Sequence, residues 1–580
     1  MTTTTTPIPP ERFRELFAAV CEERYEGTED AAIYGAVEDW DTSLIEDMSE
    51  LFPKDNALHR GVYLYTRGFD RDISRWNTSR VTNMRRMFYG IWNFNAPIGS
   101  WDTSAVTDMQ EMFSNTGWFN QPLGGWDTRS VTNMRGMFDF AEAFNQPVGG
   151  WDTSRVENMQ DMFRRAKAFN QGLESWDTRS VTNMSGMFAL AGAFNAPIGT
   201  WNTSRVRDMS RMFWGAEVFH QPVGGWDVGQ VTDMSQMFSF ARAFNQPLGN
   251  WDTSSVTTMA GMFRDAEAFN QPLGGWDVGQ VETFTVMFAG ALAFNQPLGE
   301  WDVSRATLLN GMFSGARAFD QKLGTWDVSR VTNMSHLFSH TMVFNQPLEG
   351  WDTGAVTDMR GMFCKARSFN QAVGSWNVGR VEDMCDMFHE AEVFDQPLGD
   401  WDVSQATNMM QMFCGTHVFN RPLESWNVSR VTDMEGMFSG ARAFNQPLGA
   451  WDTQHVTNMK CMFSATEAFD QELESWNVSR VTTMEGMFSG AWAFNQPLER
   501  WDTRRVTTME GMFSGAWAFN QPLERWDTRR VTNMSQMFAV TRAFNQPLAG
   551  WDTSAVTDMR GMFLDAEAFQ QMPPLLQFIP

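Results

Sequence analysis

Residues 268–278 read "AFNQPLGGWDV", residues 143–153 read "AFNQPVGGWDT", and residues 443–453 read "AFNQPLGAWDT". One phrase that recurs along a chain is either a binding site copied many times or one turn of a repeating scaffold. The two readings differ in what they predict for spacing, because stacked turns of a scaffold must all have the same length.

The tryptophan of this phrase recurs every 25 residues. From Trp76 to Trp551 is 475 residues, which is nineteen steps of 25 and therefore twenty units. A diverged unit, "WDTSLIEDMSELF", begins at Trp40, 36 residues before Trp76, so it carries 36 − 25 = 11 additional residues, placed between Phe52 and Phe69. A fixed period over most of a chain predicts a solenoid, in which each turn packs on its neighbours.

The repeat divides the chain into four predicted parts. Residues 1–39 form an N-terminal tail and capping helix, 40–75 a diverged first repeat with an insertion, 76–572 the twenty regular repeats, and 573–580 a C-terminal cap. The capping helix is predicted over residues 11–25, because open ends of a solenoid expose apolar cores. Its inward residues are Phe13, Leu16, Phe17 and Val20.

The composition limits the partners. The 580 residues carry a formal charge of −25, which repels phosphate backbones and anionic lipid headgroups and favours basic partners. No stretch of 18 apolar residues and no apolar leader are visible, so membrane insertion is not expected, and the sequence predicts a cytoplasmic or particle-associated protein unless another route exports it. The 5 cysteines show no disulfide or zinc spacing.

One unit, Trp101 to Gly125, shows two apolar patterns. Val106, Met109, Met112 and Phe113 have the spacing of one face of a short helix. Trp101 and the β-branched Thr103, at i and i+2, suit a short strand. The predicted fold class is a leucine-rich-repeat-like α/β solenoid, elongated and curved, with a short parallel strand and a short helix in each 25-residue turn.

We call residues that recur at 25-residue intervals a column and name it after one member. The Asp102 column holds Asp or Asn, so we expect its side-chain oxygen to close an Asx-turn. The Arg80 column, three residues on, could relieve repulsion between stacked Asp side chains. The amide in "FNQP" is expected to bridge successive turns. The predicted structural ladder includes Trp101, Trp126, Trp151, Trp301, Asn120, Asn145 and Asn295.

No pattern of catalytic residues is found, and no cofactor or metal is expected. His336 and His340 have ligand spacing, but no third ligand accompanies them. The methionine columns, such as Met109 and Met112, have helical spacing beside Phe and are interpreted as core. Calcium binding by the Asp102 column remains the weaker alternative, since Asn replaces Asp in several units.

The run "MFSGARAFNQPLGAWDTQHVTNM" resembles the 25-residue repeat of BspA-like leucine-rich-repeat surface proteins, the branch also found in Mycoplasma-type lipoproteins. The resemblance covers residues 40 to about 572. It implies a leucine-rich-repeat-like solenoid and, in bacteria, surface adhesion or binding of host proteins. The signal peptide and lipobox of exported members are not seen in this sequence.

The sequence therefore predicts a non-enzymatic repeat scaffold that binds a protein or glycan along an extended face. Near-identical units, such as 476–500 and 501–525, add area and valency rather than one catalytic constellation. Specificity is assigned to the variable positions 110, 111, 114, 115, 117 and 124 and their equivalents. The alternative is a self-assembling structural protein of a fibre, surface layer or virus particle.

Overall fold

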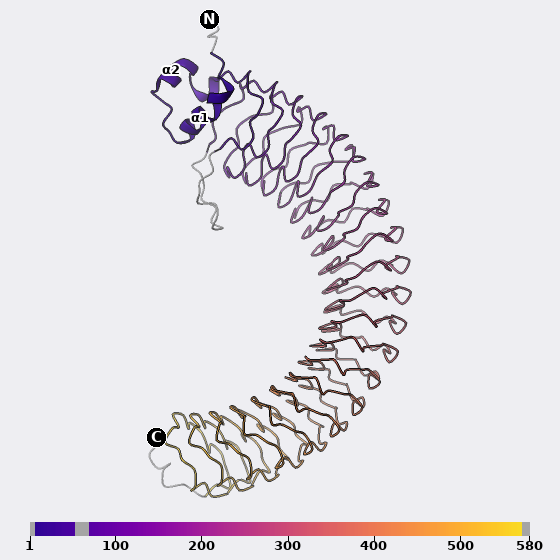
Figure 1. The fold of residues 1–580 in the computed structure, drawn as a ribbon, viewed down its shortest axis with the longest axis vertical. Helices are drawn as coiled ribbons and strands as arrows, with labels where there is room; N and C mark the ends of the chain where they lie inside the picture. The colour runs from indigo at the N-terminus through magenta and orange to yellow at the C-terminus, as the bar shows by residue number, and fades with distance from the viewer. Residues whose placement is uncertain (1–5, 53–68, 571–580) are drawn as a thin grey trace. The chain divides into compact units, whose positions relative to one another are not determined.

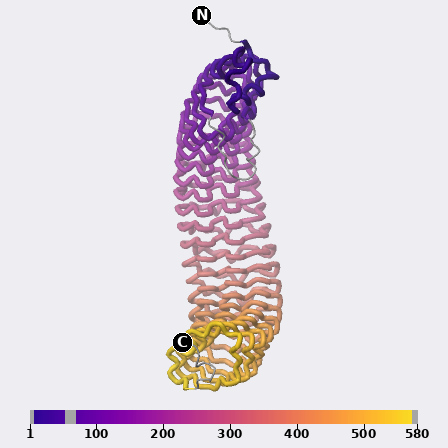
Figure 2. The backbone as a smooth tube through the Cα atoms, turned by 90° about the vertical axis from the view of Figure 1, so that its left-hand side faces the viewer, coloured from indigo at the N-terminus to yellow at the C-terminus, as the bar shows by residue number. Residues whose placement is uncertain are grey.

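The structure is a computed structural model that describes residues 6–52 and 69–570. The predicted insertion (53–68) and C-terminal cap (573–580) lie outside the described residues. The chain forms two compact units: unit 1 is Met1–Val281 with Gly290–Phe294, and unit 2 is Glu282–Ala289 with Asn295–Pro580. In each unit, successive 25-residue turns lie side by side, which confirms the repeat solenoid (Figures 1 and 2).

The helices of the described residues all lie at the N-terminal end of unit 1: α1 (Pro10–Cys21), α2 (Glu29–Tyr34) and the 3₁₀ helix η1 (Val37–Asp39). The helix α1 begins with proline, whose fixed φ suits a first turn. Phe13 and Phe17 are buried and meet the first indoles, with ring centroids 6.2 Å apart for Phe13 and Trp40 and 5.9 Å for Phe17 and Trp76. This helix therefore covers the first turn of the stack.

The segment for which a short helix is predicted, around residues 106–116 of each unit, is a hydrogen-bonded ladder between turns. Alternate amides donate to the next turn: Met109 N to Asn133 O at 3.0 Å, and Phe113 N to Met137 O at 2.8 Å. The amides between them close tight turns within the unit, as Met112 N does on Met109 O at 3.2 Å. Parallel bridges recur at Asp108 and its column.

The helix prediction is wrong for this segment because two positions in it have left-handed backbone. Glu111 has φ 52° and Asn115 has φ 60°, and their columns keep positive φ along the chain. A right-handed helix cannot pass through such residues. Glycine occupies these columns in many units, for example Gly136 and Gly215, because it adopts positive φ without strain. The apolar residues still face inward, because each tight turn redirects the chain.

The pairing between turns that is predicted at Trp101 and Thr103 lies elsewhere in the unit. Both side chains are buried, as expected, but the described bridges fall at the Asp108 column, apart from the one between Pro7 and Asp41 in the diverged first repeat. Side chains connect the turns here: Trp101 Nε1 donates to Ile73 O at 3.1 Å, and Thr103 Oγ1 donates to Asp127 O at 2.9 Å. Valine replaces threonine in this column without exposure, as at Val228.

Stacked aromatic columns fill the core of each unit. The ring centroids of Trp451 and Trp476 are 6.3 Å apart with planes 1° from parallel, whereas those of Phe438 and Phe463 are 5.7 Å apart. The backbone ladder of parallel bridges brings the turns to about 4.8 Å. Within each unit the turns are therefore closest at the ladder and widest at the Trp101 column, so each unit bends toward its ladder.

The Asn120 column joins the turns on another side. Asn120 Oδ1 accepts the Asn145 backbone amide at 3.0 Å, and Asn145 Oδ1 accepts that of Asn170 at 3.0 Å. Aspartate serves equally well, since Asp320 Oδ1 accepts the Asn345 amide at 2.9 Å. An amide or carboxylate oxygen thus makes this contact and the amide nitrogen is not needed; His220, in the same column, instead places a ring nitrogen 2.8 Å from Ala243 O.

This requirement predicts how Asn145 tolerates substitution. Asn145→Asp should leave the unfolding midpoint in urea nearly unchanged. Asn145→Leu should lower the free energy of unfolding by about 1–2 kcal/mol, because the Asn170 amide loses its acceptor. The same loss in both variants would show that the side-chain oxygen is not what holds the turns here.

Candidate interaction surfaces

The variable positions 110, 111, 114, 115 and 117 all lie on or next to the backbone ladder. We call these positions and their columns the ladder face. Their backbone is repeated from turn to turn, while their side chains change between acid, base, aromatic and glycine. Position 124 lies apart from them, in the tight turn that Trp126 N closes on Leu123 O at 3.1 Å. The ladder face therefore presents different side chains from turn to turn on a backbone whose conformation is the same in each turn.

The ladder face of unit 1 is rich in aromatic and arginine side chains. Arg86 lies over Tyr89 with its guanidinium carbon 5.2 Å from the ring centroid, and Arg165 lies over Phe140 at 4.2 Å. Arg264 lies over Phe240 at 5.4 Å. Aromatic and arginine residues supply most of the binding free energy of protein interfaces.

The same face of unit 1 is hollowed by a cavity of about 240 Å³. Trp214 and Arg211 line one part of it, and Arg164, Asp161 and Asp208 line the rest. The side chain of Arg211 is exposed and bonds to the amide oxygen of Gln236 at 3.2 Å. An indole with a guanidinium and two carboxylates can contact a flat or hydroxyl-rich group and donate or accept hydrogen bonds at its edge.

An ion pair between the half-buried Arg164 and the buried Asp139 fixes one wall of this cavity. Arg164 donates to both oxygens of Asp139, at 2.8 Å and 2.6 Å. Burial raises the pKa of Asp139, and the bidentate contact with Arg164 opposes that rise. The pair joins neighbouring turns and holds the Arg164 side chain in place.

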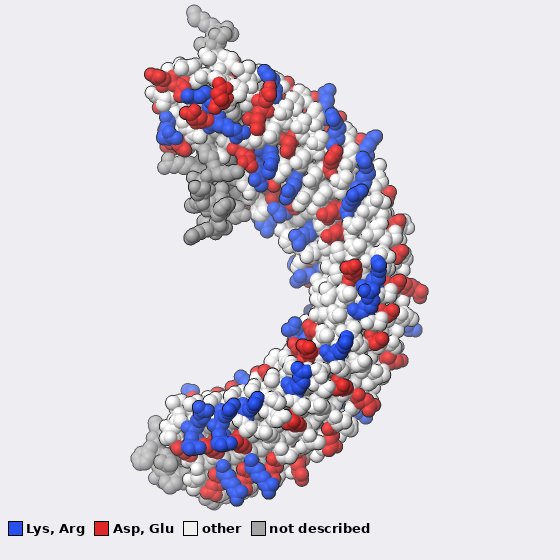
Figure 3. All heavy atoms as spheres, in the orientation of Figure 1, with Lys and Arg blue, Asp and Glu red and all other residues white. Residues whose placement is uncertain are grey.

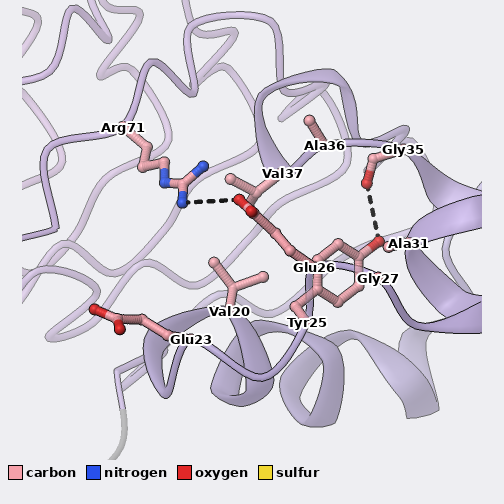
Figure 4. A pocket seen from close by; sticks show the side chains of 10 residues that line it. All are labelled: Val20, Glu23, Tyr25, Glu26, Gly27, Ala31, Gly35, Ala36, Val37 and Arg71. Atoms are coloured by element: carbon pink, nitrogen blue, oxygen red, sulfur yellow. Dashed lines mark hydrogen bonds and ion pairs between the residues drawn. The ribbon is translucent and has the colours of Figure 1, made fainter.

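A second cavity, of about 580 Å³, lies in the N-terminal cap of unit 1 (Figure 4). Its polar lining is already engaged within the protein. Tyr25 donates to Gly35 O at 3.0 Å, and Arg71 pairs with Glu26 and Glu38 at 3.3 Å each. These contacts tie α1, α2 and η1 to the first turns, and the cavity is a structural part of the cap.

The residues of the predicted ladder occupy the interior and the joints between turns. The indoles of Trp101, Trp126 and Trp151 are 3–4% exposed and stack on their neighbours, and Trp301 is 3% exposed beside Phe284, at 5.7 Å. Asn295 Oδ1 accepts the Asp320 amide at 3.0 Å. Met109 and Met112 are fully buried.

The histidines flagged by spacing lie on the ladder face of unit 2. His336 and His340 have φ of 55° and 58°, so they belong to the Glu111 and Asn115 columns. Desolvation lowers the pKa of both, and the cations Arg360 and Lys365, respectively, add to that shift. Among residues 6–52 and 69–570, no three His, Cys, Asp or Glu side chains gather in a way that could hold a metal ion. Burial raises the pKa of the Cys364 and Cys414 thiols to about 11 each.

The Asp102 column makes Asx-turns along both units. Asp102 Oδ1 accepts the Ser104 amide at 3.1 Å and the Ser104 hydroxyl at 2.6 Å, and these bonds lower the pKa of Asp102. Arginine pairs with this column from two residues on, as Arg129 does with Asp127 at 2.8 Å. In the Arg80 column, for which that role is predicted, Arg80 pairs with Glu46 and Arg430 donates to the amide oxygen of Gln405.

Turns of 25 residues, joined by a backbone ladder, stacked indoles and an asparagine column, define the class of this protein as a repeat solenoid. The chain belongs to the family described as "Mycoplasma protein of unknown function, DUF285". The family model matches six overlapping stretches: residues 59–156, 145–246, 219–324, 307–422, 394–499 and 466–575. No curated protein matches the chain. No helix within residues 6–52 and 69–570 has the length and apolar character needed to cross a membrane.

Three solved structures illustrate what the chain resembles over most of its length. The complex of TLR13 with ssRNA13 is 8% identical, with a TM-score of 0.20, and the match covers 86% of this chain and 84% of that one. A TDR receptor is 8% identical, with a TM-score of 0.21 and coverages of 87% and 89%. The leucine-rich-repeat ectodomain of GASSHO1/SCHENGEN3 from Arabidopsis thaliana is 6% identical, with a TM-score of 0.15 and coverages of 81% and 74%. Scores this low say nothing about what this chain binds.

Proposed function

We propose that this protein is a non-enzymatic scaffold that binds a protein or glycan partner along the ladder face of unit 1. One observation carries the proposal: variable aromatic and arginine side chains stand on an invariant backbone frame, around the cavity that Arg211 and Trp214 line. Such a frame positions contact residues without an ordering cost on binding. The resemblance to BspA-like proteins adds the prediction of adhesion at a surface.

The test uses a partner selected with the parent chain from a glycan array and from a displayed-peptide library. The variant R211G/W214S replaces both cavity residues by those that other turns carry in the same columns, such as Gly186 and Ser239. Glycine also suits the backbone at Arg211, where φ is 57°. We expect affinity for the selected partner to fall at least about tenfold, the loss of one or more interface hot spots.

The matched control is R205S/W118A. It removes one exposed arginine and one exposed indole from unit 1 outside the cavity lining, and Trp118 is 63% exposed. Affinity should change less than about twofold there, as is usual for contacts outside a hot spot. Equal losses in both variants would contradict the ladder-face site. Polymers in light scattering that persist in the R211G/W214S variant would favour the self-assembling alternative instead.

A further inference from the structure

Seven arginines gather on three successive turns of unit 2, although the chain as a whole carries −25. The phrase "ERWDTRRVT" occurs at residues 499–507 and again at 524–532. Lys and Arg side chains are dense near the C-terminal end of unit 2 (Figure 3). We call this set the arginine patch: Arg480, Arg500, Arg504, Arg505, Arg525, Arg529 and Arg530.

Tight turns place these side chains at the surface. Val506 N bonds to Thr503 O at 3.0 Å, so Arg504 and Arg505 form the tip of that turn. Trp526 N bonds to Leu523 O at 3.1 Å, which puts Arg525 at the tip of another. All seven are exposed.

Four of the seven are compensated by acids of this chain. Arg504 pairs with Asp502 and Arg529 with Asp527, at 2.5 Å each. Arg500 reaches Glu474 at 3.7 Å and Arg525 reaches Glu499 at 3.4 Å.

The other three belong to the Arg80 column. Arg480, Arg505 and Arg530 have no ion pair with any residue in the described ranges. Each of three consecutive turns therefore presents one uncompensated guanidinium in the same column.

We propose that the arginine patch binds an acidic segment of a partner protein in an extended conformation, with one carboxylate on each of these three guanidiniums. A guanidinium fork matches a carboxylate bidentately. An extended chain places side chains of one face about 6.6 Å apart, two residues at about 3.3 Å each. The indoles of Trp501 and Trp526, four residues before Arg505 and Arg530, repeat at 6.3 Å. The Arg80 column lies between these indoles and the backbone ladder, where Thr507 N bonds to Thr482 O at 2.9 Å and turns repeat at about 4.8 Å. Acidic residues at alternate positions thus recur within reach of the flexible arginine side chains of successive turns.

The surroundings favour a peptide over a nucleic acid. Binding of single strands relies on exposed aromatic rings on which bases stack. The indoles next to the patch, Trp501 and Trp526, are 2–3% exposed and stacked within the core.

The experiment measures binding of a fluorescein-labelled nonapeptide with glutamate at every second position and threonine between, by fluorescence anisotropy at low salt. The variant R480Q/R505Q/R530Q should bind it about tenfold more weakly, the combined effect of three exposed charge pairs. The control R155Q/R205Q/R380Q removes three exposed arginines of the same column that lie on non-adjacent turns. This control should change affinity for the peptide less than about twofold, because salt screens exposed charges that lie more than about 10 Å from the peptide.

Three comparisons can overturn the assignment. Equal losses in the two triple variants would mean that only net charge matters. Equal binding of an isomeric peptide with its glutamates in one block would remove the pitch argument. Tighter binding of a sulfated oligosaccharide or a single-stranded oligonucleotide would assign the patch to another class of partner. Loss of the ladder-face partner through R211G/W214S is independent of all three, since that site lies in unit 1.

Discussion

Trp451→Ala is expected to lower the free energy of unfolding by about 3–5 kcal/mol, the range for deleting a buried aromatic side chain. The Trp451 indole is 3% exposed and stacks between Trp426 and Trp476, at 6.4 Å and 6.3 Å. Its Nε1 donates to Leu423 O at 3.0 Å, so the variant also removes one of the two hydrogen bonds that this carbonyl accepts, the other coming from Trp426 N at 3.1 Å. The substitution removes a ring contact to each neighbouring turn and also leaves a cavity in the core.

Because each turn is held only by its neighbours, the damage should be local first. Urea unfolding followed by circular dichroism should show a broadened or two-step transition, and limited proteolysis should cut near residue 451 before the parent is cut anywhere in unit 2. The control is Trp492→Ala, an indole that is 41% exposed and stacks on Trp517 at 4.7 Å. Trp492→Ala should lower the free energy of unfolding by about 1 kcal/mol or less, which is what a stacked aromatic pair contributes. Equal effects in the two variants would show that burial in the Trp101 column is not what stabilises the turn.

The repeat and its inward columns could be predicted from sequence because stacking forces every turn to the same length. Trp101 and Phe113 recur in every regular unit, the Met109 column changes only to the apolar Phe284 and Leu309, and the structure buries Trp101, Met109 and Phe113. The local backbone could not be predicted in the same way. Apolar residues at i, i+3 and i+7 fit a helix, yet a series of tight turns brings the same side chains inward.

A signal for the tight turns was present in the sequence. Glycine at residues 136 and 215 marks the two columns of positive φ, where Asn115 and His336 also stand. Glycine, asparagine and histidine are the residues that tolerate left-handed backbone. The recurrence of glycine at two fixed positions of the unit indicates a repeated turn and is not expected of a continuous helix.

The candidate surface was only partly predictable. Variable positions follow from comparing units, and five of the six lie on or beside the ladder. The pairing of Arg164 with Asp139 and the cavity beside Trp214 depend on which side chains face each other across turns. That juxtaposition requires the register of the ladder, and the register was not apparent while the segment was interpreted as a helix.

The register also decides what the chain should tolerate by deletion. Removing residues 501–525 takes out one whole turn, and it joins Arg500 to Trp526, which restores the original phrase "ERWDTRRVT". Met484 N, which bonds to Thr508 O at 3.2 Å, then faces Asn533 O, the present partner of Met509 N at 2.9 Å. We expect circular dichroism and the midpoint of thermal unfolding to change little, since a repeat array loses one turn and gains one equivalent interface.

Removing only residues 501–512 should have a far larger effect, although fewer residues are lost. Phe513 would then follow Arg500, and every column after the junction would be out of phase with the turns before it. Trp526, which stacks on Trp501 in the parent, would not come to lie over Trp476, the last indole of the Trp101 column before the junction. The ladder, the indole stack and the asparagine column all fail at one boundary, and the turns after it retain neighbours on one side only. We expect limited proteolysis, followed by mass spectrometry, to show cuts between the junction and residue 570. The part of the unfolding transition that comes from these turns should disappear. If the 12-residue deletion unfolds like the 25-residue deletion, the turns do not depend on a shared register, and the stabilising contacts must lie within each turn.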